Sequence, residues 1–325
     1  SALENWQDWN LNSKQTRLIQ IPLADCLLGA SEIESARSTL VALLNRSRED
    51  EPALEAATRL AALSAENLTA REALLVGLAL YHHRSFDQAI PLLEAGLEDP
   101  EASSRALRQI DEIDVIYALA RSLYWQGEYE LAAQSFTTVA TRSSVPKETA
   151  RALFQRGRSY ALDGDWDRAV ESYREAANAD PYGSWAGAAE LSRLRLEWRQ
   201  GREETALQIL QHLRSRNSWR SSTERAALFL ASSNLVRSRT DGVAEWLELA
   251  RHTHRRDSPD ISYWRGRLAE LQDRPEDALD HYLSLMTRDP FHPLAQIAGA
   301  RLFEGEMKAA ARARAQQLAE SDQTT

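Results

Sequence analysis

Four arginines recur at one position of a repeated pattern in this chain, namely Arg121, Arg158, Arg195 and Arg267. The intervals between them are 37, 37 and 72 residues. A guanidinium presents a planar fork of N–H donors that binds a carboxylate with two hydrogen bonds. A row of such groups suits an anionic partner: a carboxylate-rich peptide, the peptide stems of peptidoglycan, or a C-terminal tail. In the alternative interpretation, each arginine pairs with a carboxylate of the neighbouring repeat and only holds the stack together.

The remaining residue patterns do not indicate a nucleotide or metal site. The chain lacks the G-x-x-x-x-G-K-[ST], G-x-G-x-x-G and H-E-x-x-H motifs. His252 and His254 are two residues apart, so they project from different sides of a helix, and the adjacent pair His82 and His83 meets the same objection. We interpret all four as solvated histidines in loops or at helix ends, and we predict no cofactor and no metal.

Nucleophiles and acid–base pairs give no catalytic constellation either. Cys26 lies in the apolar stretch Leu23–Leu28, which favours a buried and inert thiol. No pair of carboxylates stands out as a general acid and base, so we predict that this chain is not an enzyme. Four tryptophans lie near the ends of predicted helices or at turns, and we predict core packing for them, with stacking on sugar rings as the alternative: Trp125, Trp166, Trp198 and Trp264.

The composition predicts an all-α protein. Strong helix formers dominate the 325 residues, whereas only 13 glycines and 10 prolines are present. The net charge of −9 argues against nucleic acid or an anionic membrane as the main partner. The longest uncharged stretches, such as Ala73–His83, are 11 residues long, whereas a membrane-spanning helix needs about 20. A single cysteine is compatible with both the cytoplasm and the periplasm.

An alanine followed four residues later by a larger residue recurs along the chain and sets the period. The intervals between these alanines are 43, 37, 37 and 72 residues, the last being about two periods: Ala89, Ala132, Ala169, Ala206 and Ala278. A helical period of 34 to 40 residues is the signature of a solenoid built from helical hairpins.

The stretch from Thr149 to Pro181 shows the physics of one such unit. A first helix and a second helix each have one apolar face, and Asp163-Gly164-Asp165 forms the turn between them. Small residues at Gly157 and Ala169 let the two helices approach closely. Asp180-Pro181 ends the second helix, because proline lacks a backbone donor and disfavours helix in the residue before it.

These residues resemble the tetratricopeptide repeat. The resemblance rests on Gly157, Tyr160, Gly164, Trp166, Ala169, Tyr173, Ala176 and Pro181, and in the preceding unit on Ala120, Tyr124, Gly127, Tyr129, Ala132 and Phe136. It covers about 73–213 and 261–290. In that family the first helices line a concave groove, so the resemblance implies that the four arginines face this groove.

The run from Tyr263 to Leu302 has a narrower resemblance. Its pattern of YW-x-x-R-x-x-E, A-L-x-x-Y and P-x-x-x-L-A-x-x-x-x-A-R-L is similar to the last superhelical repeats of soluble lytic transglycosylases, which are periplasmic enzymes that cleave peptidoglycan. In those enzymes a lysozyme-like catalytic domain follows the helical repeats. This resemblance implies a noncatalytic helical part and a periplasmic or cell-envelope location.

We therefore expect about 16 helices stacked in antiparallel pairs as a right-handed superhelix. Residues 1–30 form a capping segment in which Trp6 and Trp9 cover the first hairpin, 31–303 form the array, and 304–325 form a C-terminal helix and polar tail. Helix starts are predicted at four capping patterns: Ser31-x-x-Glu34, Thr69-x-x-Glu72, Ser221-x-x-Glu224 and Ser258-Pro259.

Two functions remain open at this point. The first is a noncatalytic scaffold of a bacterial cell-wall protein that positions glycan or a partner protein. The second is a general tetratricopeptide adaptor that binds peptides or proteins in its groove, in any compartment including the cytoplasm. The sequence does not determine the oligomeric state.

Overall fold

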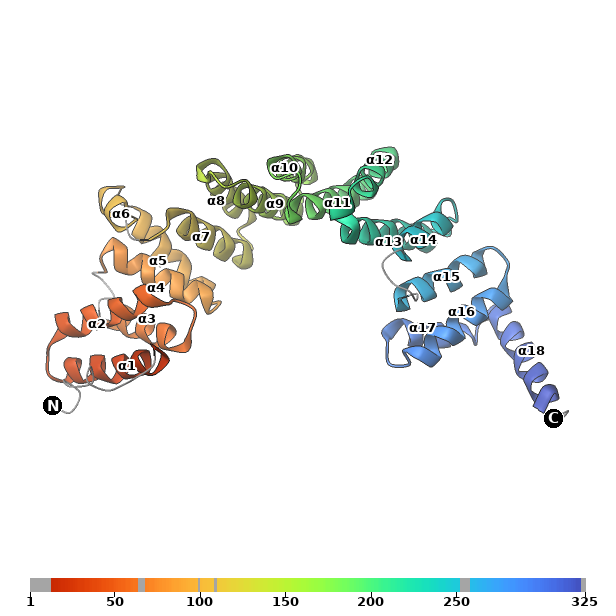
Figure 1. Cartoon of the computed structure of the whole chain (residues 1–325), viewed down its shortest axis with the longest axis horizontal. Helices are drawn as coiled ribbons and strands as arrows, with labels where there is room; N and C mark the ends of the chain where they lie inside the picture. Colours follow the sequence, from red (N-terminus) through yellow and green to blue (C-terminus); the bar gives the residue numbers. More distant parts are fainter. Residues whose placement is uncertain (1–12, 64–67, 99, 108–109, 252–257, 323–325) are drawn as a thin grey trace. The chain divides into compact units, whose positions relative to one another are not determined.

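The computed structural model describes residues 13–63, 68–98, 100–107, 110–251 and 258–322. Within these ranges all regular structure is helical, with eighteen α-helices, one 3-10 helix and no strand, so the prediction of an all-α fold is confirmed (Figure 1). The chain divides into two compact units, Ser1–Asp180 and Pro181–Thr325, which we call unit 1 and unit 2.

Unit 1 is built from ten helices in its described part. They are α1 (Ser13–Gly29), α2 (Ile33–Arg46), α3 (Glu51–Leu63), α4 (Ala70–His82), α5 (Phe86–Glu98), α6 (Pro100–Ala106), α7 (Glu112–Gln126), α8 (Tyr129–Arg142), α9 (Pro146–Asp163) and α10 (Trp166–Ala179). Short turns join α4 to α5, α7 to α8 and α9 to α10, and the two helices of each pair pack against each other as a hairpin. Each hairpin also packs on the next one along the chain.

Unit 2 follows the same plan. Its described helices are α11 (Ser184–Arg199), α12 (Glu203–Arg214), the 3-10 helix η2 (Asn217–Trp219), α13 (Arg220–Val236), α14 (Val243–Arg251), α15 (Pro259–Leu271), α16 (Pro275–Arg288), α17 (Pro293–Arg301) and α18 (Gly305–Asp322). The hairpins are α11 with α12, α13 with α14, and α15 with α16. None of the helices in the described ranges combines the length and apolar character of a membrane span.

Two helices were not expected from the sequence. The helix α1 lies in the segment 1–30, for which the sequence predicts only a cap, and it buries Arg17, Ile21 and Ala24 against the following helices. The helix α6 has only seven residues, too few for an apolar period to be recognised. It lies between α5 and α7, which explains why the interval from Ala89 to Ala132 is 43 residues and not 37. The predicted cap residues Trp6 and Trp9 lie outside the described ranges.

The hairpin of α9 and α10 has the predicted close approach. A Cβ atom at Gly157 would come within 2.7 Å of the Tyr173 ring and 3.2 Å of the Ala169 carbonyl oxygen. Gly164 ends α9 in the left-handed conformation with φ of 88°, which glycine adopts without strain. The small residues of the repeat therefore set the distance between the paired helices.

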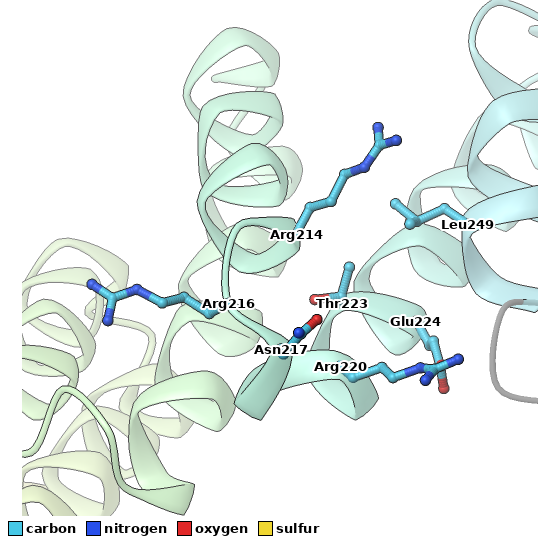
Figure 2. A pocket seen from close by; sticks show the side chains of 7 residues that line it. All are labelled: Arg214, Arg216, Asn217, Arg220, Thr223, Glu224 and Leu249. Atoms are coloured by element: carbon cyan, nitrogen blue, oxygen red, sulfur yellow. The ribbon is translucent and has the colours of Figure 1, made fainter.

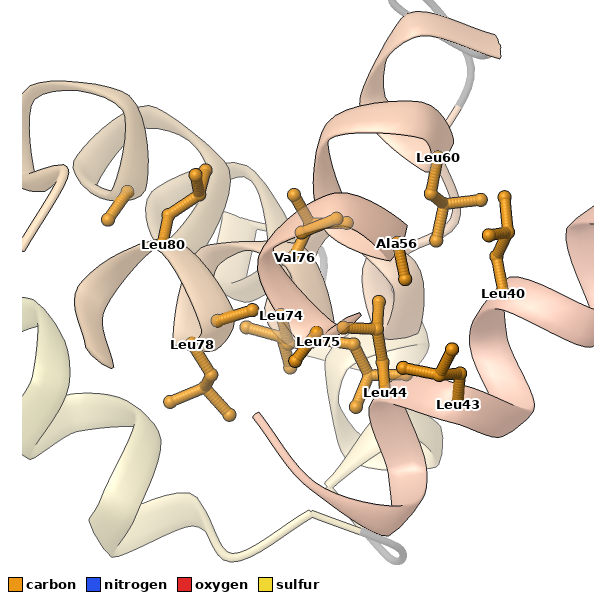
Figure 3. Packing of buried hydrophobic residues seen from close by; sticks show 14 of the residues in the cluster. Leu40, Leu43, Leu44, Ala56, Leu60, Leu74, Leu75, Val76, Leu78 and Leu80 are labelled. Carbon is orange, nitrogen blue, oxygen red and sulfur yellow. The ribbon is translucent and has the colours of Figure 1, made fainter. Parts of the chain in front are cut away.

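Aliphatic side chains from successive helices form the core of the N-terminal hairpins (Figure 3). Leu40, Leu43 and Leu44 of α2 meet Leu60 of α3 and a continuous buried run of α4. The helix α4 is buried on nearly all sides because α2, α3, α5, α6 and α7 surround it. This packing explains why its sequence is apolar throughout and not amphipathic.

Two of the four predicted helix starts are confirmed. At the start of α4 the Thr69 side chain accepts a hydrogen bond from the Glu72 backbone amide, and the Glu72 side chain accepts one from the Thr69 backbone amide. At the start of α15 the Ser258 side chain caps the helix. The other two predictions are wrong. Ser31 has a φ of 62° and α2 begins only at Ile33, while Ser221 lies inside α13 because η2 runs directly into that helix.

Three predictions of burial are also wrong. Cys26 is exposed, because the buried face of α1 carries residues 17, 20, 21 and 24, and position 26 points away from it. Trp125 and Trp166 are 49% and 40% exposed, since both lie at the turn of their hairpin. The prediction of core packing is confirmed for Trp198, which is 2% exposed.

Candidate binding surface

The helices α7 and α9 each present a row of polar and aromatic residues spaced four and three apart, which places each row on one helical face. The two rows are Tyr117, Arg121 and Tyr124 on α7, and Arg151, Gln155 and Arg158 on α9. Contacts between the rows join them into one surface, which we call the arginine–tyrosine face.

Arg121 and Arg158 are brought together at the centre of this face. The Nη1 atoms of both donate to the same acceptor, Gln155 Oε1, at 3.5 Å and 3.2 Å. Both guanidiniums also lie over the ring of Tyr124, at 5.5 Å and 5.1 Å from its centroid. Gln155 and Tyr124 are 6% and 5% exposed, so two buried neutral side chains contact the two half-buried guanidiniums from below.

A third arginine extends the face. The guanidinium of Arg151 lies 4.1 Å from the centroid of the Tyr117 ring, and its buried Nε atom has no hydrogen-bond partner. Burial raises the pKa of the Tyr81 hydroxyl on α4, and Arg121 and Arg151 oppose this effect. Both cations therefore lie close to Tyr81, which makes α4 part of the same surface.

One aspartate, Asp114, interacts electrostatically with Arg151, and no ion pair joins the two in the part of the chain that the structure describes. Burial raises the pKa of Asp114, as does the neighbouring Asp111, whereas Arg151 and Arg48 lower it. Burial lowers the pKa of Arg48, whose buried Nε atom has no partner. Among the residues that the structure describes, no ion pair joins a carboxylate to Arg121, Arg151 or Arg158.

The other two predicted arginines belong to unit 2 and have different surroundings. Arg195 on α11 lies 5.6 Å from the centroid of the Phe229 ring, and its pKa is lowered by burial and by the nearby Arg225 and Arg199. Its buried Nε atom has no partner. Arg267 on α15 forms an ion pair with Glu270 of the same helix.

Glu270 also binds side chains of the next two helices, α16 and α17. Arg301 of α17 donates to its carboxylate at 2.6 Å, and the Tyr282 hydroxyl donates at 2.8 Å. For Arg267 the interpretation as a structural ion pair therefore agrees with the geometry. In the described ranges Arg121, Arg158 and Arg195 have aromatic neighbours in place of a carboxylate partner.

A separate pocket of about 330 Å³ lies in unit 2 among α12, η2, α13 and α14 (Figure 2). Arg214 pairs with Glu245 at 3.3 Å and Arg220 with Glu224 at 3.4 Å. Figure 2 shows Arg216 pointing away from the other side chains, and it lies over Tyr182 and Trp219. Because carboxylates already balance the cations that face this pocket, it is a weaker candidate for an anion site.

The histidines lie where the sequence placed them or outside the described ranges. His82 is the last residue of α4, and burial lowers its pKa. His83 follows it, with Nε2 at 3.0 Å from the Asp50 carbonyl oxygen. His252 and His254 fall in 252–257, which the structure does not describe. The described residues contain no group of three or more potential metal ligands.

Sequence reasoning identified Arg121 and Arg158 but missed their neighbours. Tyr117, Tyr124, Arg151 and Gln155 lie one helical turn or two from these arginines, at spacings of three, four and seven residues. The helical period around each recurring arginine was therefore a usable signal. It could not show that the two rows touch, since that contact joins different hairpins.

Comparison with known proteins agrees with the hairpin geometry. The tetratricopeptide-repeat family model matches residues 117–184 and 239–293. No curated protein matches the chain. Among solved structures, pilF of Pseudomonas aeruginosa is 15% identical, with 89% of this chain and 98% of that chain covered and a TM-score of 0.38.

Two further solved structures are similar at this level. A tetratricopeptide repeat protein of Parabacteroides merdae is 14% identical, with 87% of this chain and 99% of that chain covered and a TM-score of 0.41. MamA AMB-1 is 21% identical, with 54% of this chain and 92% of that chain covered and a TM-score of 0.41. From its hairpins and the two matched segments, the chain is an all-α solenoid of tetratricopeptide-like repeats.

Proposed function

We propose that this chain is a noncatalytic scaffold that binds an anionic segment of a partner protein on the arginine–tyrosine face. The observation that carries the proposal is the group of three half-buried arginines, Arg121, Arg151 and Arg158, with no ion pair to a carboxylate of the described residues. Structural arginines at such positions normally have an acidic partner, as Arg267 does.

Electrostatics supports an anionic ligand in particular. Partial burial makes a guanidinium more responsive to a nearby anion, because fewer water molecules screen the interaction. The protein as a whole carries a formal charge of −9, so this face is a local cationic area on an acidic molecule. Such an area attracts an acidic segment of the partner, whereas the acidic remainder of the surface repels that segment.

Binding of labelled acidic peptides and of muropeptides, measured by fluorescence anisotropy, tests the proposal. We expect a double variant, Arg121→Ala with Arg158→Ala, to bind at least about tenfold more weakly, because each charge-assisted hydrogen bond contributes about 1.5–3 kcal/mol. Arg174→Ala is the matched control, since Arg174 is exposed on α10 and pairs with Glu171. Equal affinity of the double variant and the control would contradict the proposal.

A second proposal concerns location and the kind of partner. The resemblance of Tyr263–Leu302 to the helical repeats of lytic transglycosylases supports a periplasmic or cell-envelope setting, in which the anionic groups are peptide stems of peptidoglycan. The muropeptide arm of the binding experiment tests this ligand, and fractionation of the native host tests the location. Recovery in the cytoplasmic fraction alone would favour the general adaptor.

A further inference from the structure

We propose that Arg121 and Arg158 form one site for a dianionic phosphate group, such as a phosphorylated side chain of the partner, and that Gln155 holds the two guanidiniums in place. This inference rests on the proposed function, because it names the group that the partner presents. It concerns the centre of the arginine–tyrosine face, where two cations from consecutive hairpins meet at one oxygen atom.

Unit 2 contains a similar pair of arginines that already has a carboxylate of the chain between them. There, Arg267 and Arg301 also come from two different helices, α15 and α17, which pack against each other. Both donate to the carboxylate of Glu270, which lies one helical turn from Arg267. Two guanidiniums and an internal anion thus form a network that the Tyr282 hydroxyl completes.

Unit 1 also has two arginines that share one acceptor, but that acceptor is a neutral amide oxygen. Gln155 lies one helical turn from Arg158 and accepts from both arginines, as Glu270 does in unit 2. Glutamine has the shape of glutamate but no charge, so the two guanidiniums have an acceptor and no counter-ion. An external anion is the group that would complete the network.

The geometry and charge together indicate a dianion. Because both Nη1 atoms lie within 3.5 Å of one oxygen, a single oxyanion beside that oxygen can reach both guanidiniums. A carboxylate would neutralise one of the two positive charges of the arginines. A phosphate monoester carries nearly two negative charges at neutral pH and so can neutralise both. Its oxygen atoms also match the forks of two arginines at once.

The buried groups below the arginines limit their movement before any ligand arrives. Tyr124 lies under both guanidiniums, and Tyr124 and Gln155 are each more than nine-tenths buried. Cations that are already positioned lose less side-chain freedom when an anion binds. Gln155 is therefore a positioning residue, and its replacement by glutamate would supply the missing charge from within.

Calorimetric titration of the full chain with inorganic phosphate at pH 8, where phosphate is a dianion, tests the site directly. We expect saturable binding to the parent protein. Binding should weaken at least about tenfold in Gln155→Glu, because the new carboxylate pairs with both guanidiniums, and also in Arg158→Gln, which removes one of them. Arg174→Gln is the control and should bind as the parent protein does. Circular dichroism confirms that each variant keeps its helices.

The inference would be overturned by a lack of saturable phosphate binding to the parent protein, or by the same affinity in Gln155→Glu as in the parent. Acetate, a monoanion, should bind more weakly than phosphate, and equal binding of the two would also contradict a dianion site. The Gln155→Glu variant should be more resistant to thermal unfolding than the parent, which separates an internal ion pair from simple loss of structure.

A pair of peptides separates this inference from the proposed function. The peptides differ only in phosphoserine against serine within an acidic segment. If inorganic phosphate binds in a way that depends on Gln155 but neither peptide binds, the oxyanion site stands and the proposed function fails. If both peptides bind equally well and binding depends on Arg121 and Arg158, the proposed function stands and the phosphate site is wrong.

Discussion

Glu72 shows how one side chain can serve both a helix start and a contact between hairpins. Its carboxylate accepts from the Thr69 backbone and hydroxyl at the start of α4, and it pairs with Arg37 of α2. Burial raises the pKa of this carboxyl, but the hydrogen bonds from Arg37 and Thr69 outweigh burial and hold it below its ordinary value. The folded protein therefore favours the ionised form.

We predict that Glu72→Gln lowers the free energy of unfolding at pH 7 by about 1–3 kcal/mol, because it removes the charge of the carboxylate to which Arg37 and Thr69 donate. The stabilisation from Glu72 is present above the ordinary pKa near 4.5 and is lost as the pH falls through the lower folded pKa. Urea unfolding of both proteins at pH 7 and pH 3 checks this, and the difference should shrink at pH 3.

The matched control is Glu101→Gln, since the pair of Glu101 and Arg105 is largely exposed on α6. Exposed pairs of this kind contribute little, so the free energy of unfolding should change by less than about 0.5 kcal/mol. A Glu72→Gln variant as stable as this control would contradict the structural role of the Glu72 network.

At the scale of helices, the spacing of the α9–α10 and α15–α16 hairpins depends on a glycine in the first helix that faces a tyrosine ring in the second. Gly157 faces Tyr173, and Gly266 faces Tyr282 in the same way. Tyr173 and Tyr282 are 4% and 0% exposed, so neither ring can turn out into solvent without opening the hairpin. The repeat therefore requires glycine at these positions despite its low helix propensity.

We predict that Gly157→Ala destabilises the protein by about 1–3 kcal/mol, because the added methyl group overpacks the space beside Tyr173. The helix preference of alanine, about 1 kcal/mol, acts in the opposite direction and does not offset the clash. Urea unfolding followed by circular dichroism measures the change.

Gly29→Ala is the control at this scale. A Cβ atom at Gly29, the last residue of α1, meets nothing within 4 Å. We expect its free energy of unfolding to stay within about 0.5 kcal/mol of the parent value. If both alanine variants were equally stable, close helix contact would not be the reason for glycine at 157.

At the scale of the whole molecule, stability comes from contacts between neighbouring hairpins within each unit. The hydrophobic clusters of the described residues between Ile21 and Ala152 lie in unit 1, and the cluster from Tyr263 to Ala311 lies in unit 2. In solenoids each repeat depends mainly on its neighbours, so a sufficiently long part retains its own core.

We therefore predict that a fragment of residues 1–180 folds by itself. It should retain a helical circular dichroism spectrum and unfold cooperatively in urea, because it contains large hydrophobic clusters formed by its own residues. It should also retain any affinity of the full chain for phosphate, since Arg121, Gln155 and Arg158 all lie within it. Loss of helical signal in the fragment would show that unit 2 is needed for folding.

The sequence by itself determined the helical class, the hairpin period and the small residues at helix contacts. These features follow from local patterns: Gly157 with Tyr173, the turn at Gly164, and the cap at Thr69 with Glu72 each lie within one hairpin or one helical turn. Even the short helix α6 has a signal in the sequence, because the interval from Ala89 to Ala132 is 43 residues in place of 37.

The sequence shows Glu270 three residues after Arg267, but only the tertiary structure decided that Arg121 and Arg158 meet at a neutral side chain. Arg267 and Arg121 occupy the same position of the repeat, yet one pairs with Glu270 and the other meets Gln155 and Tyr124. The contact of Arg121 with Gln155 joins residues 34 positions apart and lies between two hairpins. A periodic pattern in one chain cannot specify such convergence, because the period repeats the position but not its neighbours.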